Sequence, residues 1–349
     1  MGFEPNYKNI TDAAFNRSVN TFPLYDHCFD DGIIGSVLNV DMKALASSSS
    51  PADRKEYFRQ YTLFHKQMGY DTVVYEVCAG GYMPGSGALG GHKPGVIKTH
   101  EDFEKYPWDE IPDIYFKNAS ENFRLLGEVM PDGMKAVGGV GNGIFECVQD
   151  VVGYMDLCYM KEDDPDLYCA MFKKVGDMLI NIWSRFLKEF GDTFCMCRFG
   201  DDLGFKSETL ISHEDIKTLI LPQYKRIVDL VHSYNKPFLL HSCGQLFGVM
   251  DDIISMTGID AKHSNEDVIA PFSKWVELYG EKIGNFGGID TDVICSDDEK
   301  YVREYTLDVL RSVDGKKGLA IGTGNSVPGY VSPAGYLAMN EAIREYRGR

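Results

Sequence analysis

A histidine and a cysteine stand two residues apart, directly after an apolar stretch of the chain. The apolar residues are 238–240, and His241 and Cys243 follow them. If the stretch is a β-strand, alternate side chains share a face, so the imidazole and the thiol point the same way at its end. Zinc prefers nitrogen and thiolate ligands. The spacing therefore predicts a zinc site, and the alternative is a buried thiol beside a hydrogen-bonded core histidine.

Apolar segments that end abruptly in polar residues recur along the whole chain. Eight of them predict strands, at residues 22–25, 72–75, 135–137, 194–199, 238–240, 258–261, 282–286 and 318–321. Stretches with helical periodicity lie between most of these segments, among them 166–190, 213–234 and 297–313. Strands that alternate with helices form parallel sheets, and eight such units predict an α/β fold of the (β/α)₈ TIM barrel type.

Polar residues that follow the predicted strands are the candidate site, because reactive side chains of such barrels lie at the carboxyl ends of the strands. Besides His241 and Cys243, these residues are His27, Glu76, Asn142, Asp201, Asp202, His263, Glu266, Asp290 and Asn325. Arg198 lies within a predicted strand, where a charge must be paired, so we expect a structural ion pair with an inward carboxylate. Cys195 and Cys197 share a face of that strand among apolar neighbours, and we expect them to pack in the core.

Length and composition fit one barrel domain, residues 1–349, with an N-terminal helical extension at about residues 1–20. No apolar run approaches the roughly 20 residues that span a bilayer, and the first residues lack the features of a secretion signal. Nine cysteines without a small-scaffold pattern fit reduced thiols. We therefore expect a cytoplasmic protein without a membrane partner.

The net charge of −17 argues against binding to nucleic acid, which requires clustered Lys and Arg. It is compatible with a basic protein partner, but it favours acidity that only keeps the protein in solution. The glycine-rich segment 79–92 lacks the order of a phosphate-binding loop. Its length and position after a strand fit either a lid over the barrel mouth or a plain surface loop.

Four short motifs occur in a fixed order: Gly200-Asp201-Asp202-Leu203-Gly204, His241-Ser242-Cys243-Gly244, Gly287-Gly288-Ile289-Asp290 and Gly322-Thr323-Gly324-Asn325. From about residue 22 to the C-terminus, the chain resembles the uroporphyrinogen decarboxylase superfamily. The resemblance is to its corrinoid-dependent methyltransferase branch, of the methylcobamide:coenzyme M methyltransferase type. It implies a (β/α)₈ barrel that moves a methyl group between the cobalt of a corrinoid protein and a small methyl donor or acceptor. Zinc activates a thiol in the best-known cases.

This chain departs from the pattern of the relatives it resembles at the zinc site and near the first strand. Thiol-methylating members complete the zinc site with a second cysteine after the final strand, where this chain has Asn325. Glu266 or His263 would then be the third zinc ligand, leaving one position open for substrate. Asn325 is a poor zinc ligand and would bind a carbonyl or ether oxygen of the substrate. True decarboxylases carry arginines near the first strand, where residues 24–31 are acidic instead.

Roles for the remaining candidates follow from their residue types. We expect Asp202, Glu76 and Asn325 to take part in catalysis, with Glu76 as a general acid or base or else a surface carboxylate. We expect a second group of residues to contact substrate: His27, Asn142, Asp201 and Asp290. One of Asp201 and Asp202 faces the pocket and the other caps a loop, and Asp290 either binds substrate or holds its own turn.

No corrinoid-binding D-x-H-x-x-G signature occurs in the chain, so methylcobalamin or a related corrinoid must arrive on a separate protein that docks over the barrel mouth. Alternatives are a uroporphyrinogen decarboxylase-like lyase, or a metal-assisted lyase or hydrolase that uses His241, Asp201 and Asp202. A non-catalytic binder is a further alternative. The sequence leaves open the methyl donor or acceptor, the direction of transfer and the oligomeric state, a homodimer included.

Overall fold

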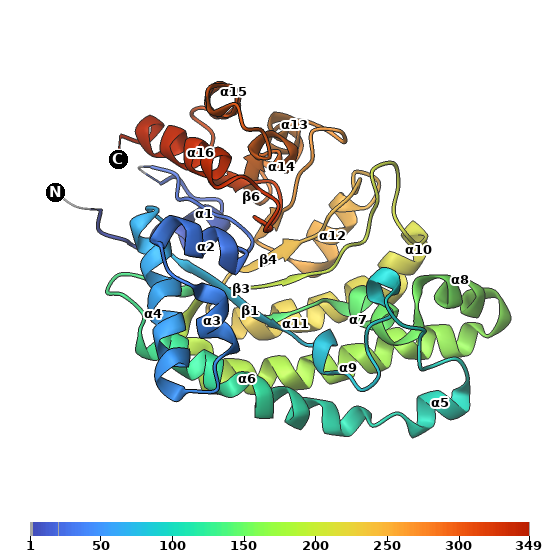
Figure 1. Ribbon diagram of the computed structural model, residues 1–349. Coiled ribbons are helices and arrows are strands. Elements are labelled where there is room, and N and C mark those ends of the chain that lie inside the picture. The colour runs from blue at the N-terminus through green and yellow to red at the C-terminus, as the bar shows by residue number, and fades with distance from the viewer. Residues whose placement is uncertain (1–2, 20, 349) are drawn as a thin grey trace.

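Seven parallel β-strands form the centre of the computed structural model, which describes residues 3–19 and 21–348 (Figure 1). The strands are β1 (Val73–Cys78), β2 (Ala136–Gly141), β3 (Phe194–Gly200), β4 (Phe238–His241), β5 (Ala261–His263), β6 (Gly284–Ile289) and β7 (Leu319–Thr323). Each strand is hydrogen-bonded to the next one in chain order. The sheet curls like a TIM barrel, so all seven carboxyl ends open on the same side of the molecule.

The eighth predicted strand, at residues 22–25, is not a strand in the structure. It is joined to β7 by one isolated parallel bridge between Leu24 and Ile321. Tyr25 N donates to Ile321 O at 3.0 Å, and Ile321 N donates to Pro23 O at 2.9 Å. Proline has no N–H to donate, which shortens the pairing on this segment. The prediction of eight strands is therefore not confirmed, although the N-terminal segment does lie beside the last strand.

Helices surround the sheet, and C-terminal helix α16 packs beside α2 near the N-terminus (Figure 1). The sixteen α-helices of the described residues are α1 (Lys8–Ala14), α2 (Asp31–Leu38), α3 (Met42–Ser47), α4 (Pro51–Gln67), α5 (His100–Lys105), α6 (Ile111–Glu128), α7 (Ile144–Val152), α8 (Tyr154–Asp163), α9 (Pro165–Phe190), α10 (His213–Asp215), α11 (Leu221–Ser233), α12 (Met250–Thr257), α13 (Phe272–Tyr279), α14 (Thr291–Ile294), α15 (Glu299–Ser312) and α16 (Pro333–Tyr346).

Helix boundaries follow from capping residues in the sequence. Asp164 accepts from Leu167 N at the start of α9, and Asp298 accepts from Tyr301 N at the start of α15. These caps satisfy backbone donors that the first helical turn leaves free.

The helix predicted over residues 213–234 is interrupted by a π-helical turn, Ile216–Ile220. Pro222, which cannot donate a backbone hydrogen bond, follows that turn and accounts for the irregularity.

Buried residues confirm the expected core of the sheet. All seven residues of β3 are buried, including Cys195 and Cys197, so that pair packs in the core as predicted. All nine cysteines are free thiols. Among the residues that the structure describes, no helix has the length and apolar character needed to cross a membrane.

Candidate metal centre

His241 and Cys243 come together at the end of β4, as their spacing predicts. His241 Nε2 lies 3.5 Å from Cys243 Sγ. Asp202, which follows β3, accepts the backbone N–H of Cys243 at 2.8 Å and holds the same oxygen 3.9 Å from His241 Nε2. The three side chains therefore present one nitrogen, one sulfur and carboxylate oxygens to a common point.

The two motifs that supply these ligands pack directly against each other. Gly244 has φ +92°, a conformation that glycine adopts readily. A Cβ on Gly244 would lie only 2.1 Å from the carbonyl carbon of Gly204. Glycine at this position therefore allows the loops after β3 and β4 to approach closely, and this approach brings Asp202 next to Cys243.

The residues at this point fit a zinc ion. Ligand atoms that share a tetrahedral zinc lie about 3.5 Å apart, given metal–ligand distances near 2.0 to 2.3 Å. The potential ligand atoms of Asp202, His241 and Cys243 all lie within 4.8 Å of one another, close to that geometry. Glu266, the expected third ligand, is absent from this group among the described residues. The structure thus places Asp202 where the sequence suggested Glu266.

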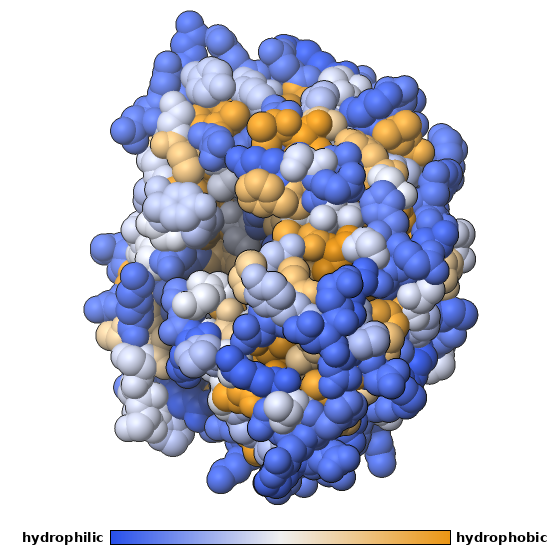
Figure 2. Space-filling view, turned by 90° about the vertical axis from the view of Figure 1, so that its right-hand side faces the viewer, coloured by the Kyte–Doolittle hydropathy of each residue, from blue (hydrophilic) through white to orange (hydrophobic). Residues whose placement is uncertain are grey.

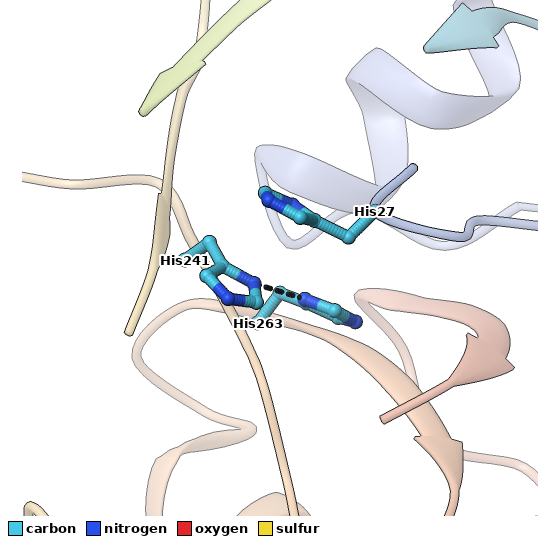
Figure 3. A group of neighbouring side chains, drawn as sticks. All are labelled: His27, His241 and His263. Atoms are coloured by element: carbon cyan, nitrogen blue, oxygen red, sulfur yellow. Dashed lines mark hydrogen bonds between the residues drawn. The ribbon is translucent and has the colours of Figure 1, made fainter. Parts of the chain in front are cut away.

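Three buried histidines lie side by side inside the barrel (Figure 3). The rings of His27 and His241 stack with centroids 3.7 Å apart. His241 Nδ1 and His263 Nδ1 are 2.7 Å apart, and His263 Nε2 lies 2.9 Å from the carbonyl oxygen of Thr323. His263 therefore contacts His241 rather than Cys243, which differs from its expected role as an alternative zinc ligand.

Asn325 lies beside the thiol, in the place where the resemblance implied a cysteine. Its Nδ2 is 3.4 Å from Cys243 Sγ, and its Oδ1 accepts from Ser326 N at 2.8 Å. Ser264 Oγ is 3.7 Å from the same sulfur. The thiol is thus surrounded by an imidazole, a carboxylate and two neutral hydrogen-bonding groups.

Glu76 and Arg198 form an ion pair inside the barrel. Arg198 Nε donates to Glu76 Oε2 at 3.0 Å, and the arginine side chain is fully buried. Arg198 also donates to Tyr25 Oη at 2.7 Å and to the carbonyl oxygen of His27. His27 Nε2 is 3.9 Å from Glu76 Oε1. The structural ion pair expected for Arg198 is confirmed, and its carboxylate partner is Glu76.

Asp201 has both carboxylate oxygens engaged away from the candidate metal ligands. It accepts the backbone N–H groups of Phe145 and Glu146 at 3.0 and 2.7 Å, at the start of α7. Tyr224 Oη donates to it at 2.5 Å, and the side chain is fully buried. Asp201 thus caps α7, and because its side chain is fully buried, the substrate contact that the sequence suggested stays a prediction.

Asn142 connects the glycine-rich segment to α7. Its Oδ1 accepts from Gly80 N at 3.2 Å, and its Nδ2 donates to Glu146 Oε2 at 2.7 Å. Asp150 of the same helix accepts from Gly87 N at 2.8 Å, so the glycine-rich segment is anchored at two points. Glu146 was missed in the sequence analysis, because it lies within a helix rather than directly after a strand.

A cavity of about 650 Å³ opens next to Asn325, at the carboxyl ends of β5 to β7. Its lining includes Glu266 and Asp290 with Lys206, Asp267, Val268, Thr291, Asp292, Val293, Tyr301, Tyr305, Ser326, Pro328 and Tyr330. Asp290 also accepts the backbone N–H groups of Asp267 and Asp292 at 2.7 and 2.8 Å. Asp290 therefore holds its own turn and also lines a cavity, and its contact with substrate stays a prediction. Figure 2 views the molecule from the side on which α8 and α10 lie and shows a hollow whose rim carries both hydrophilic and hydrophobic side chains.

Burial favours the neutral forms of His27, His241, Cys243 and Glu146. Desolvation lowers the pKa of His27 and of His241, and the positive charge of Arg198 acts in the same direction. Burial raises the pKa of the Cys243 thiol to about 12, with a further contribution from Asp202. Burial also raises the pKa of Glu146, next to Asp201 and Asp202. Deprotonation of Cys243 near neutral pH would therefore need a bound cation.

Lys262 is a second residue that the sequence analysis missed, because a lysine within a strand gives no sign of its burial. Its ammonium group donates to the carbonyl oxygen of Ser264 and lies 3.9 Å from the ring centroid of Trp275. Burial lowers its pKa from 10.5 to about 7, although the groups of Cys243 and Asp202 oppose that change. The folded protein therefore tends to release this proton.

The contribution of Lys262 to the stability of the metal-free protein should consequently rise with pH between about pH 7 and pH 10, where this lysine is protonated in the unfolded chain and not in the folded chain. We expect Lys262→Met to remove this part of the pH dependence. Urea denaturation across that pH range measures the effect, with exposed Lys188→Met as the matched control. Equal slopes for Lys262→Met and the wild type would contradict the prediction.

The chain is similar in sequence to one protein family and in structure to several solved proteins. A family model described as uroporphyrinogen decarboxylase (URO-D) matches residues 89–346. Curated protein sequences give no match. A solved methyltransferase from Methanosarcina mazei is 15% identical, with a TM-score of 0.72 over 98% of this chain and 99% of that chain. A putative vitamin-B12 independent methionine synthase from Listeria monocytogenes is 12% identical, with a TM-score of 0.48 over 93% of this chain and 96% of that chain. The similarity to the Methanosarcina mazei structure shows a shared fold.

Proposed function

Because the chain belongs to the uroporphyrinogen decarboxylase family, we propose that it is a methyltransferase of that family, which moves a methyl group between a corrinoid protein and a small molecule. The observation that carries the proposal is the group formed by Asp202, His241 and Cys243 beside Asn325. The Methanosarcina mazei protein of the same fold, named a methyltransferase, supports the type of reaction. The corrinoid would be the substrate that a separate partner protein brings to the barrel mouth.

Zinc would be held by His241 Nε2, Cys243 Sγ and one oxygen of Asp202. When bound, the zinc ion would act as a Lewis acid and keep the Cys243 thiol deprotonated near neutral pH. Asp202 fixes the backbone of Cys243 through the N–H group, and Asn325 offers its amide at 3.4 Å from the sulfur. The amide of Asn325 would orient an oxygen or nitrogen atom of the small molecule toward this point.

The small molecule would occupy the cavity next to Asn325. Asn325 both lines this cavity and contacts Cys243, so a ligand there would lie close to the proposed metal ligands. Four carboxylate side chains and three tyrosines line the cavity, with one lysine, Lys206. Such a wall would repel a polycarboxylate such as uroporphyrinogen, which argues against the lyase alternative. It would attract a cation through charge and aromatic rings.

We therefore expect a methylated ammonium ion to bind more tightly than an anion of similar size, by about 10-fold or more. Calorimetric titration with tetramethylammonium, neopentyl alcohol and pivalate separates the charge of the ligand from its size. Asp292→Asn should weaken binding of the ammonium ion, because Asp292 lines the cavity without a cationic partner among the described residues. Exposed Glu104→Gln, distant in sequence and without such a role, is the control. Preferential binding of pivalate would contradict this expectation.

Methyl transfer itself is tested by the absorbance of methylcobalamin under anaerobic conditions. With purified protein and a panel of thiols, amines and ethers, we expect one class to cause demethylation of methylcobalamin or methylation of cob(I)alamin. The change should depend on Cys243, so Cys243→Ala serves as the inactive comparison. No spectral change with any member of the panel, in zinc-loaded protein, would overturn the proposed function in favour of a metal-assisted lyase or a non-catalytic binder.

A further inference from the structure

His263 and His241 form the centre of a chain of hydrogen bonds that begins at a backbone carbonyl group. Thr323 O lies 2.9 Å from His263 Nε2. A carbonyl oxygen can only accept, so His263 carries a proton on Nε2. A neutral imidazole has one N–H, which leaves a lone pair on His263 Nδ1.

That lone pair fixes the proton of the next ring. His241 Nδ1 is 2.7 Å from His263 Nδ1, so one proton lies between the two nitrogens, and His241 must donate it (Figure 3). The lone pair of His241 is then on Nε2. This is the nitrogen that lies 3.5 Å from Cys243 Sγ and 3.9 Å from Asp202 Oδ1.

The alternative, a doubly protonated His263, would reverse this pattern and place a proton on His241 Nε2. The surroundings oppose it, because His263 is fully buried and forms no ion pair with a carboxylate among the described residues. Desolvation of this buried ring disfavours its doubly protonated form, and the positive charge of Arg198 acts in the same direction.

The two rings are held in place on several sides. Parallel pairing of β4 with β5 sets His241 opposite His263. His27 stacks on His241 at 3.7 Å, and the Tyr25 ring meets the edge of His263 with centroids 5.2 Å apart. A Cβ on Gly287 would lie 3.0 Å from His263 Cδ2, so glycine there leaves room for the ring. Neither ring can turn without breaking these contacts.

From this geometry we infer that His263 is a positioning residue, which holds His241 in the tautomer that presents Nε2 to a metal ion. The inference rests on the proposed function, because it concerns the nitrogen with which His241 would bind zinc. It also gives His263 a role different from that of a ligand, since both of its nitrogens are engaged. Histidine ligands of metals commonly donate their other N–H to a fixed acceptor, and here the acceptor is a second histidine.

The test compares His263→Leu, which removes the acceptor, with His263→Asn, whose side-chain oxygen can still accept the His241 proton. We expect the leucine variant to bind zinc about 10- to 100-fold more weakly in competition with a chelator, and the asparagine variant to stay close to the wild type. Buried His65→Leu is the matched control, because His65 bonds to Tyr61 O away from the proposed ligands. Circular dichroism checks that each variant is folded.

A second measurement reports the tautomer without any metal. In metal-free protein with ¹⁵N-labelled histidine, long-range proton–nitrogen correlations should show His241 protonated on Nδ1, and a shift toward Nε2 in His263→Leu. A proton on Nε2 of His241 in the wild type, or unchanged zinc affinity in the leucine variant, would overturn the inference. Neither outcome depends on methyl transfer, so this inference and the proposed function can fail separately.

Discussion

Replacement of Cys243 with alanine is expected to abolish both zinc binding and methyl transfer. The same result is expected for His241→Ala, because each variant removes one of three proposed ligands whose potential ligand atoms lie within 4.8 Å of one another. Loss of a partner outside the ligand shell already costs about 10- to 100-fold in metal affinity, so loss of a ligand should cost more than about 100-fold. Metal content by mass spectrometry, on protein purified without chelators, measures the effect.

We expect about one zinc ion per chain in the wild type, the stoichiometry of a single site. Cys169→Ala is the matched control, since Cys169 is an exposed free thiol on α9. Asn325→Cys would place a second thiol next to Cys243 and should bind zinc more tightly than the wild type, provided that Asn325 occupies the place of a ligand. A metal-free wild type, or zinc retained in both alanine variants, would refute the zinc site.

Glu76→Leu is expected to destabilise the fold by about 3–5 kcal/mol, because it leaves a buried guanidinium group without its carboxylate. Arg198 is fully buried, and its Nη2 lacks a hydrogen-bond partner among the described residues, so the guanidinium group has an unpaired N–H even before Glu76 is removed. The double variant Glu76→Leu/Arg198→Met should recover much of this loss, since it removes both charges. Urea denaturation of the wild type, Glu76→Leu, Arg198→Met and the double variant gives the coupling free energy between the two side chains.

This prediction separates a structural role of Glu76 from a purely catalytic one. A residue that acts only as general acid or base could be replaced by leucine without loss of stability. Glu128→Leu is the comparison, because Glu128 pairs with Lys55 at the surface, where loss of a pair changes stability by less than about 1 kcal/mol. A Glu76→Leu variant as stable as Glu128→Leu would contradict the structural role.

Much of the site could be predicted because strand ends in a parallel sheet converge. The change from apolar to polar residues located His241, Asp202 and Asn325 at one edge, and the alternation of side chains explains why His241 and Cys243 meet. The two neighbouring carboxylates have different surroundings, which their shared place after the strand did not reveal. Asp202 contacts the Cys243 backbone, whereas Asp201 caps α7.

The position of Asp202 beside Cys243 could not be predicted, because it depends on how two loops pack. Asp202 reaches Cys243 through the close contact of Gly204 with Gly244, which no local pattern reveals. Glu266 follows its strand in the same manner as Asp202, yet it lines the neighbouring cavity instead. The burial of Lys262 was hidden for a similar reason, since Trp275, on which its ammonium group lies, comes from a later helix.

The contact between the N-terminal segment and β7 also constrains the order in which the chain can fold. Asp26 accepts a hydrogen bond from the backbone of Thr323, a residue 297 positions later. At ordinary rates of protein synthesis, about 15 to 60 s separate the appearance of these two residues. During that interval Leu24 has no partner strand, and the growing sheet keeps an open edge that invites association with other chains. Pairing of the N-terminal segment therefore has to wait until β7 has been synthesised, and that edge of the sheet stays unpaired until then.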